Sequence, residues 1–184
     1  TGSLGIAALA GGARKVVQTD RNARYLKLAE RSAELSQLDP LLQNCLIGDF
    51  FRVVSKLKVE KHLFDWVILD PPFFSSDDSG SVDIAANQAA LINKVRPLVA
   101  HGGTLAVINN GLFVSGEAFL NEIEALCQDG YMRLEELVPV PADCTGYPET
   151  VVGGNYPADY QPFNGPTKIV LLKVERKDEA VSTS

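Results

Sequence analysis

The chain has 184 residues, of which 46% are hydrophobic, and a formal net charge of −6 at pH 7. This size and apolar content fit one globular domain with a sizeable core, and no apolar run approaches the roughly twenty residues of a membrane span. There is no signal-peptide pattern and no internal repeat, so we expect a cytoplasmic protein without a membrane partner. The three cysteines have no metal-ligand spacing, and no metal site is predicted.

The charge is distributed unevenly along the chain. Residues 1–62 contain ten Lys and Arg against six Asp and Glu, whereas residues 63–184 contain seven against seventeen. Nonspecific affinity for nucleic acid comes mainly from Lys and Arg that displace counterions. If the substrate is RNA, its binding surface is therefore expected in the basic first third or in another domain, and no DNA partner is predicted.

The chain begins with a glycine turn, Gly2, Ser3 and Gly5, that leads into a helix through Ala13. A turn of this kind normally follows a buried strand whose end it wraps, and no strand precedes it here. We therefore expect the first strand of the sheet to be missing from the given chain. The glycines alone are a weak signal, because close packing of a helix on a strand would also require them.

A short strand, Lys15–Asp20, ends on an acid fifteen to eighteen residues after the glycines. Near this spacing, an acid at a strand end hydrogen-bonds a ribose hydroxyl. Asp20 would also serve as a cap for the next helix, Arg21–Leu38, which has an apolar stripe. We expect ribose binding because Asp20 is one member of an ordered set of acids. The stripe includes Leu26, Ala29 and Ala33.

Two further strands end on acids in the same way. Asn44–Gly48 runs into Asp49 and Phe50, which open another helix. Trp66–Leu69 is a continuous apolar run, too short for a helix, and predicts a strand buried on both faces. The residues that follow this run are Asp70, Pro71, Pro72, Phe73 and Phe74.

The turn after Leu69 is rigid and rich in hydrogen-bond acceptors. Two prolines fix φ and remove two backbone donors, so the carbonyls of Asp70 and Pro71 remain as acceptors. Phe73 and Phe74 follow where a loop should be solvated. An acid, a rigid turn and exposed aromatic rings at the end of a buried strand predict a platform for a flat polar ligand.

The remaining elements alternate in the same α/β manner. At Asn109-Asn110-Gly111 a strand breaks off, and there the two carboxamides either meet a ligand or tolerate a left-handed turn. The other predictions are a loop over Ser75–Ser81, a helix over Val82–Ala100 stopped by Gly102-Gly103, a strand over Thr104–Ile108, a helix over Ser115–Asp129, and strands over Met132–Val138 and Thr167–Val174.

The segment 139–166 holds six of the ten prolines, together with Tyr147, and no Lys or Arg. A structureless loop of this length inside a compact domain is usually a lid or a binding surface. It would contact bases or protein through aromatic faces. We predict one domain over residues 1–174 and a flexible tail over residues 175–184.

Strands that end in acids and alternate with helices predict a doubly wound α/β sheet. The glycine turn followed by Asp20, Asp49 and Asp70-Pro71-Pro72 resembles the class I S-adenosylmethionine-dependent methyltransferases over essentially the whole chain. The resemblance implies a Rossmann-like, doubly wound, mostly parallel sheet with an antiparallel last strand. It also implies S-adenosylmethionine as the cofactor.

The resemblance further implies roles for individual residues. Asp20 would bind the ribose hydroxyls, Asp49 with Phe50 would contact the adenine, and the glycine turn would hold the methionine part. The implied cofactor-binding residues are Gly2, Ser3, Gly5, Asp20, Arg21, Asp49, Phe50 and Asp70. The implied catalytic residues are Asp70, Pro71 and Phe73, and the substrate-binding residues are Pro72, Phe73, Phe74, Asn109 and Tyr147.

Three stretches are similar to bacterial large-subunit ribosomal RNA methyltransferases of the 5-methylcytosine type. They are Gly-Ala-Arg-Lys-Val-Val at residues 12–17, the Phe64–Phe74 segment, and Tyr-Pro-Glu at residues 147–149. Those enzymes usually carry an N-terminal RNA-binding portion. The resemblance therefore implies ribosomal RNA as the partner, bound through a portion absent from the given chain.

The sequence leaves two alternatives for the atom that receives the methyl group. Methylation of cytosine at carbon 5 needs a thiolate that adds to the ring, and the resembled enzymes have a Cys where this chain has Asn109-Asn110. Cys144, in the long loop, is the alternative nucleophile. Transfer to an exocyclic amine needs no thiol, because acceptors at Asp70 and Pro71 would orient the amine hydrogens while Phe73 stacks on the base.

Two other functions also fit the sequence. One is a methyltransferase with a protein or small-molecule acceptor, which the acidic balance permits. The other is a degenerate methyltransferase fold that acts as a binding or scaffold subunit.

Overall fold

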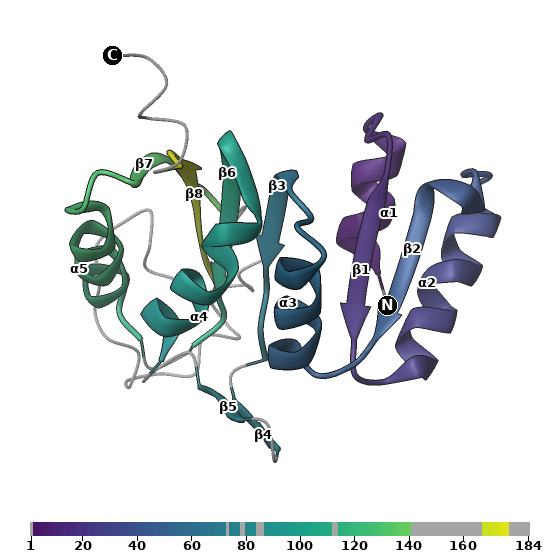
Figure 1. The fold of residues 1–184 in the computed structure, drawn as a ribbon, viewed down its shortest axis with the longest axis horizontal. Helices are drawn as coiled ribbons and strands as arrows, with labels where there is room; N and C mark the ends of the chain where they lie inside the picture. The colour runs from purple at the N-terminus through teal and green to yellow at the C-terminus, as the bar shows by residue number, and fades with distance from the viewer. Residues whose placement is uncertain are drawn as a thin grey trace, which may run out of the picture. The chain divides into compact units, whose positions relative to one another are not determined.

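The computed structural model describes residues 2–72, 74–77, 80–83, 87–111, 114–140 and 167–176, with the backbone alone for 74–77 and 80–83. The chain forms two compact units, Thr1–Glu60 and Lys61–Ser184, which are presented separately (Figure 1). None of the described helices is long and apolar enough to cross a membrane.

The first unit contains a parallel pair of strands that are connected through one α-helix and preceded and followed by another (Figure 1). Strands β1 and β2 pair in register from Val16 opposite Gln43 to Asp20 opposite Ile47. Because the strands run in the same direction, their carboxyl ends lie at the same edge. The elements are α1 (Ser3–Ala10), β1 (Val16–Asp20), α2 (Ala23–Leu35), the short 3-10 helix η1 (Pro40–Leu42), β2 (Gln43–Ile47) and α3 (Phe50–Val59).

Helix α2 buries the stripe predicted from the sequence, since Leu26, Ala29 and Ala33 are all at most 5% exposed. The helix begins later than predicted. Asn22 is its N-cap, and the Asn22 side chain accepts a hydrogen bond from the backbone N–H of Arg24. Asp20 is therefore not the cap of this helix, and the helix-capping interpretation of Asp20 is wrong.

Helix α1 ends at Ala10, three residues before the predicted Ala13. Gly11 is its C-cap and Gly12 follows with a φ of 96°. A residue in this left-handed region ends helical hydrogen bonding, and glycine adopts it without a Cβ clash.

The second unit contains a mixed four-stranded sheet in the order β3-β6-β8-β7 (Figure 1). Strand β6 is parallel to β3, and β8 is antiparallel to both β6 and β7, so β8 alone runs in the opposite direction. The predicted antiparallel last strand is confirmed. The elements are β3 (Phe64–Leu69), β4 (Phe74–Asp77), β5 (Gly80–Asp83), α4 (Gln88–Val95), the 3-10 helix η2 (Arg96–Leu98), β6 (Val99–Asn109), α5 (Gly116–Cys127), β7 (Met132–Val138) and β8 (Lys168–Val174).

The core of this unit lies around the two central strands. Leu105 of β6 and Leu172 of β8 are completely buried, as are Phe119 and Ile123 of α5 and Ile92 of α4. Helix α5 begins where the sequence predicts, because Ser115 caps it by accepting a hydrogen bond from the Ala118 N–H at 2.9 Å.

Three sequence predictions are wrong in this unit. The loop predicted over Ser75–Ser81 lies instead in an antiparallel hairpin of β4 and β5. The helix predicted over Val82–Ala100 is only α4 with η2, because Pro97 lacks the N–H that would continue the helix and Val99 already begins β6. The predicted burial of β3 on both faces fails too, since Trp66 is 52% exposed on this edge strand.

Gly102-Gly103 was predicted to stop a helix but lies within β6. Gly102 has a φ of 68°, and a Cβ at Gly103 would come within 2.9 Å of the backbone oxygen of Asp65. The pairing register of β3 with β6 shifts between Phe64 and Trp66. Gly103 therefore allows the two backbones to approach closely at an irregularity of the sheet, and Gly102 supplies the left-handed conformation beside it.

We expect Phe119→Ala to lower the free energy of unfolding by about 3–5 kcal/mol, because it leaves a large cavity in a fully packed core. Phe119 is 0% exposed. Urea denaturation of the full-length protein measures this loss. Leu41→Ala is the control: Leu41 is 87% exposed and should change stability by less than about 0.5 kcal/mol. Equal losses in the two variants would contradict the assigned core.

Candidate functional site

Two acids of the first unit lie at the carboxyl edge of its parallel strand pair. Asp20 is the last residue of β1, and Asp49 follows β2 after Gly48. The backbone N–H of Gly48 donates to the backbone oxygen of Asp20 at 3.1 Å, which ties the two strand ends together. Both arrows end at the same edge in Figure 1. In open α/β sheets, ligands bind at this edge.

Asp20 has a carboxylate oxygen available to a ligand. Its Oδ1 accepts a hydrogen bond from the Asn22 N–H at 2.7 Å, which fixes the orientation of the side chain. No described residue donates to Oδ2. Arg21, beside it, is exposed. Asp20 is therefore an oriented acceptor at the strand edge.

Asp49 is the N-cap of α3 and is more fully engaged. Its Oδ1 accepts from the Arg52 N–H at 3.0 Å, and its Oδ2 lies 3.2 Å from Arg52 Nε. The adjacent Phe50 ring packs edge-to-face on Phe51, with ring centroids 5.2 Å apart. The sequence prediction gave Asp49 a cofactor role, and the structure adds a helix-capping role.

The glycine turn is required by packing within the first unit. Gly2 has a φ of 75°, and a Cβ there would collide with the Cβ of Ala29. A Cβ at Gly5 would lie 2.5 Å from Cδ of Gln18 on β1. Ser3 is exposed at the first position of α1. The glycines are therefore needed for the close approach of α1 to its neighbours, whether or not they also approach a ligand.

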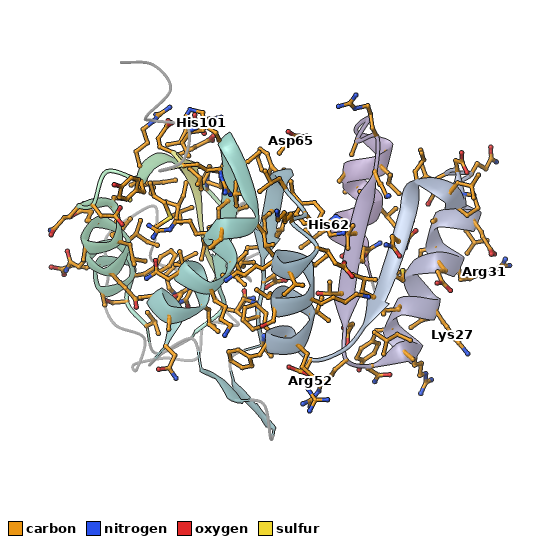
Figure 2. All side chains as sticks on the ribbon, viewed as in Figure 1. Lys27, Arg31, Arg52, His62, Asp65 and His101 are labelled. Atoms are coloured by element: carbon orange, nitrogen blue, oxygen red, sulfur yellow. The ribbon has the colours of Figure 1, made fainter. Side chains whose placement is uncertain are left out.

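Basic side chains project from the helices of the first unit. Lys27 and Arg31 on α2 and Arg52 on α3 extend outward at the surface (Figure 2). Arg31 forms an ion pair with Glu34 at 2.7 Å, with both side chains more than half exposed. This is the basic region that the charge distribution predicted in the first third of the chain.

In the second unit, Asp70 belongs to a chain of three polar side chains at one edge of the sheet. Asn110 Nδ2 donates to Asp70 Oδ1 at 3.0 Å, and Thr167 Oγ1 donates to Asn110 Oδ1 at 3.0 Å. Burial raises the pKa of the Asp70 carboxyl above its ordinary value, and the hydrogen bond from Asn110 opposes this rise. Asp70 nonetheless keeps an exposed face.

Asn109 has a different environment from its neighbour Asn110. It is 0% exposed. Its Nδ2 donates to Gln88 Oε1 at 2.6 Å, and its Oδ1 accepts from the Gly111 N–H at 2.8 Å. Lys168 Nζ donates to the Gly111 oxygen at 3.1 Å. The Asn109 amide is thus used to hold the backbone beyond β6, and its predicted contact with substrate stays a prediction.

The structure describes only some of the other residues that were predicted to be catalytic or to bind the substrate. Pro71 is buried and Pro72 is exposed. Phe74 begins β4, and only its backbone is described. Phe73, Tyr147 and Cys144 lie outside the described residues, as does most of the 139–166 loop. Their predicted roles stay predictions.

The sequence prediction missed the partners of the Asp70 carboxylate. It offered a ligand contact for both carboxamides of the Asn109-Asn110 pair and named only Asn109 as substrate-binding, but it did not predict that Asn110 holds Asp70, and it gave no polar role to Thr167 or Lys168. The available signal was the order of the strands. An antiparallel last strand that pairs with the strand ending at Asn109 must begin beside that residue, and the observed register places Lys168 opposite Asn109.

Comparisons with known proteins agree with this architecture. A family model described as conserved hypothetical protein 95 matches residues 1–102. A protein described as a methyltransferase and solved with S-adenosylhomocysteine superimposes with a TM-score of 0.77 at 19% identity, covering 92% of this chain and 42% of the other. A protein from Streptococcus mutans described as S-adenosylmethionine-dependent gives a TM-score of 0.74 at 18% identity, covering 92% and 41%.

An rRNA methylase from Streptococcus thermophilus superimposes with a TM-score of 0.54 at 14% identity, covering 95% of this chain and 83% of the other. At these identities the likeness concerns the fold, which is that of the Rossmann-like methyltransferases. The chain spans about two fifths of the length of the first two structures.

We expect Asp49→Ala to destabilise the protein by roughly 0.5–2 kcal/mol through loss of the α3 cap, whereas Asp49→Asn keeps a capping oxygen and should cost only a few tenths. Urea denaturation measures both variants. Ser115→Ala, which removes the cap of α5, is the matched control and should resemble Asp49→Ala. If Asp49→Asn were as damaging as Asp49→Ala, the capping role would be refuted.

Proposed function

The chain belongs to the conserved hypothetical protein 95 family, and we propose that it is the cofactor-binding part of an S-adenosylmethionine-dependent methyltransferase that modifies a base of ribosomal RNA in the cytoplasm. The observation that carries the proposal is the carboxyl edge of β1 and β2. There Asp20 presents an oriented carboxylate with one oxygen that no described residue occupies.

The chemistry of this edge fits the cofactor. A ribose presents two adjacent hydroxyl donors, and an ionised carboxylate is an acceptor with two oxygens. The Asn22 N–H holds one oxygen of Asp20 at 2.7 Å, so the carboxylate is oriented before a ligand arrives. Pre-orientation of this kind lowers the entropic cost of binding. Asp20 would take the ribose, with Arg21 beside it.

The remaining cofactor contacts rest on the family resemblance. Gly2, Ser3 and Gly5 would lie along the methionine part, and Asp49 with Phe50 would contact the adenine. The capping of α3 by Asp49 supports this assignment, because it fixes the carboxylate at the helix start, where the adjacent Phe50 ring packs edge-to-face on Phe51.

The cofactor supplies a methyl group already activated by its sulfonium centre, so the protein's share of the reaction is alignment and exclusion of water. Alignment of this kind is worth roughly 7–11 kcal/mol of the barrier. Asp70 and the carbonyl of Pro71 would accept hydrogen bonds from the methyl acceptor, and Phe73 would stack on the base. Pro72, Phe74, Asn109 and Tyr147 would complete the substrate side.

RNA is supported as the substrate by two observations. Basic side chains project from α2 and α3, in the part of the chain where Lys and Arg exceed Asp and Glu. One protein of similar fold is an rRNA methylase. The net charge of −6 opposes binding of phosphates by the chain as a whole, so a further portion of the protein would supply most of the affinity for RNA.

We expect Asp20→Ala to weaken binding of S-adenosylmethionine at least about 100-fold, because charged hydrogen bonds of roughly 1.5–3 kcal/mol each are lost. Isothermal titration calorimetry on the full-length protein measures this. Asp39→Ala is the matched control. Asp39 also accepts a hydrogen bond from the backbone N–H two residues along, at 2.9 Å, but it caps η1 and does not end a strand, so its loss should leave the affinity unchanged. Absence of binding to the unmodified protein would refute the proposed cofactor.

We expect ribosomal RNA from cells that lack the gene to lack the methyl group on one base, because the proposed enzyme that transfers it is absent. Nuclease digestion followed by mass spectrometry identifies the base and the methylated atom. Reintroduction of the unmodified gene should restore the methyl group, and the Asp20→Ala gene should not. If every ribosomal RNA modification persisted in the deletion strain, RNA would be rejected in favour of a protein or small-molecule acceptor, or of a scaffold function.

A further inference from the structure

We propose that Asn110 and Thr167 are positioning residues, which hold the Asp70 carboxylate so that its second oxygen accepts a hydrogen bond from the methyl acceptor. This inference rests on the proposed function and deepens it. It implies that the group that receives the methyl carries an N–H or O–H, which donates a hydrogen bond to Asp70. The geometry of the second unit alone carries the argument.

The three residues come from three different strand ends. Asp70 follows β3, Asn110 follows β6 and Thr167 precedes β8. Because β6 is parallel to β3 and antiparallel to β8, the ends of β3 and β6 and the beginning of β8 meet at one edge of the sheet. Residues that are 40 and 57 positions apart in sequence thereby form hydrogen bonds of 3.0 Å each.

The chemistry of the three groups decides which atoms donate and which accept in the two hydrogen bonds. An ionised carboxylate only accepts hydrogen bonds, so the Asn110 amide must turn its NH₂ group toward Asp70. Its oxygen then faces Thr167 and accepts from the hydroxyl. The reversed amide would place its oxygen against a carboxylate oxygen and lose the bond to Asp70, whereas the Thr167 hydroxyl can donate or accept. The carboxylate therefore sets the direction of the amide, and Thr167, by donating to the amide oxygen, helps to hold the amide beside the carboxylate.

The backbone that carries Asn110 is held on both sides. The buried Asn109 amide links Gln88 Oε1 at 2.6 Å to the Gly111 N–H at 2.8 Å. The buried Lys168 donates to the Gly111 oxygen at 3.1 Å. Asn109 thus points into the core, while Asn110 is exposed beside Asp70. A side chain on so firmly held a backbone can orient its partner.

One oxygen of Asp70 is left for a ligand. Oδ1 is occupied by Asn110, and no described residue donates to Oδ2. The residue keeps an exposed face. A carboxylate oxygen with no donor attracts an N–H or O–H group of an incoming molecule. The exocyclic amine of a base has such hydrogens and can be both the donor to Asp70 and the group that is methylated, whereas carbon 5 of cytosine has no polar hydrogen of its own.

The test compares Asn110→Ala and Thr167→Val with Thr167→Ser, which retains the hydroxyl. In the full-length protein we expect Asn110→Ala to lower kcat for methyl transfer to ribosomal RNA roughly 10-fold to 100-fold, the loss of one charged hydrogen bond. Affinity for S-adenosylmethionine should fall less than kcat, because Asp70 is only one of the proposed cofactor contacts. Thr167→Val should lower kcat by a smaller factor, and Thr167→Ser should keep the kcat of the unmodified protein. Asn93→Ala, at an exposed position of α4, is the control for folding.

The second readout is the ionisation of Asp70. The Asn110 hydrogen bond favours the charged carboxylate, so its removal should raise the pKa of Asp70 further. The acidic limb of the kcat/KM profile should then move to higher pH, and carbon-13 NMR titration of the carboxyl should show the same shift. A residue that served only stability would alter neither quantity.

The outcomes separate this inference from the proposed function. An active unmodified protein together with unchanged kcat and unchanged Asp70 ionisation in Asn110→Ala would overturn the positioning role alone. No methyl transfer by the unmodified protein would overturn the proposed function, and with it the acceptor assigned to Asp70. A product methylated at carbon 5 would overturn that acceptor even if the variants lost activity.

Discussion

The pairing of β8 between β6 and β7 is the constraint on which the second unit depends. It reverses one strand in the sheet and brings Thr167 and Lys168 beside the end of β6. Val170 and Leu172 are completely buried, so a shift of one residue would expose the apolar face of the strand. The same shift would separate Thr167 from Asn110. Burial of apolar side chains thus fixes the register, and the register decides which polar groups meet at the edge.

The glycines and the acids of the first unit differ in what they reveal about function. Gly2 is required by its φ of 75° and by packing against Ala29, whereas a Cβ at Gly5 would meet only the Gln18 side chain, so a glycine at position 2 would be expected even in a protein without a ligand. Local structure explains Asp20 only in part. One oxygen accepts from the Asn22 N–H at 2.7 Å, but the carboxylate neither caps α2 nor forms an ion pair with a described residue, and no described residue donates to the other oxygen. The acid is therefore the stronger indication of a binding site.

Much of the fold followed from local patterns in the sequence. The buried stripe of α2, the start of α5 at Ser115 and the strands that end on Asp20 and Leu69 were predicted because each depends on neighbouring residues. The hairpin of β4 and β5 was missed because its Ser- and Gly-rich sequence has little apolar alternation. The length of α4 was missed because β6 begins before the glycines, where tertiary pairing with β3 overrides the helical pattern.

The candidate site was predictable in its acids but not in the groups that orient them. Each acid lies at the end of its own strand. Asn110, which donates to Asp70, lies 40 residues along the chain, and Thr167, which donates to Asn110, lies a further 57 residues along. No local pattern connects residues at such distances. They are brought together only by the order of the strands, which in turn depends on the burial of apolar side chains throughout the unit.

The chemistry of an amide explains why Asn110 suits its place. It must join a carboxylate, which only accepts, to a hydroxyl that then donates, and an amide carries a donor and an acceptor on adjacent atoms. An Asp there would set two negative charges side by side, and a Cys is a weak donor. At this strand end the amide of Asn110 organises Asp70 through a hydrogen bond of 3.0 Å, and under the proposed function that carboxylate serves as a hydrogen-bond acceptor.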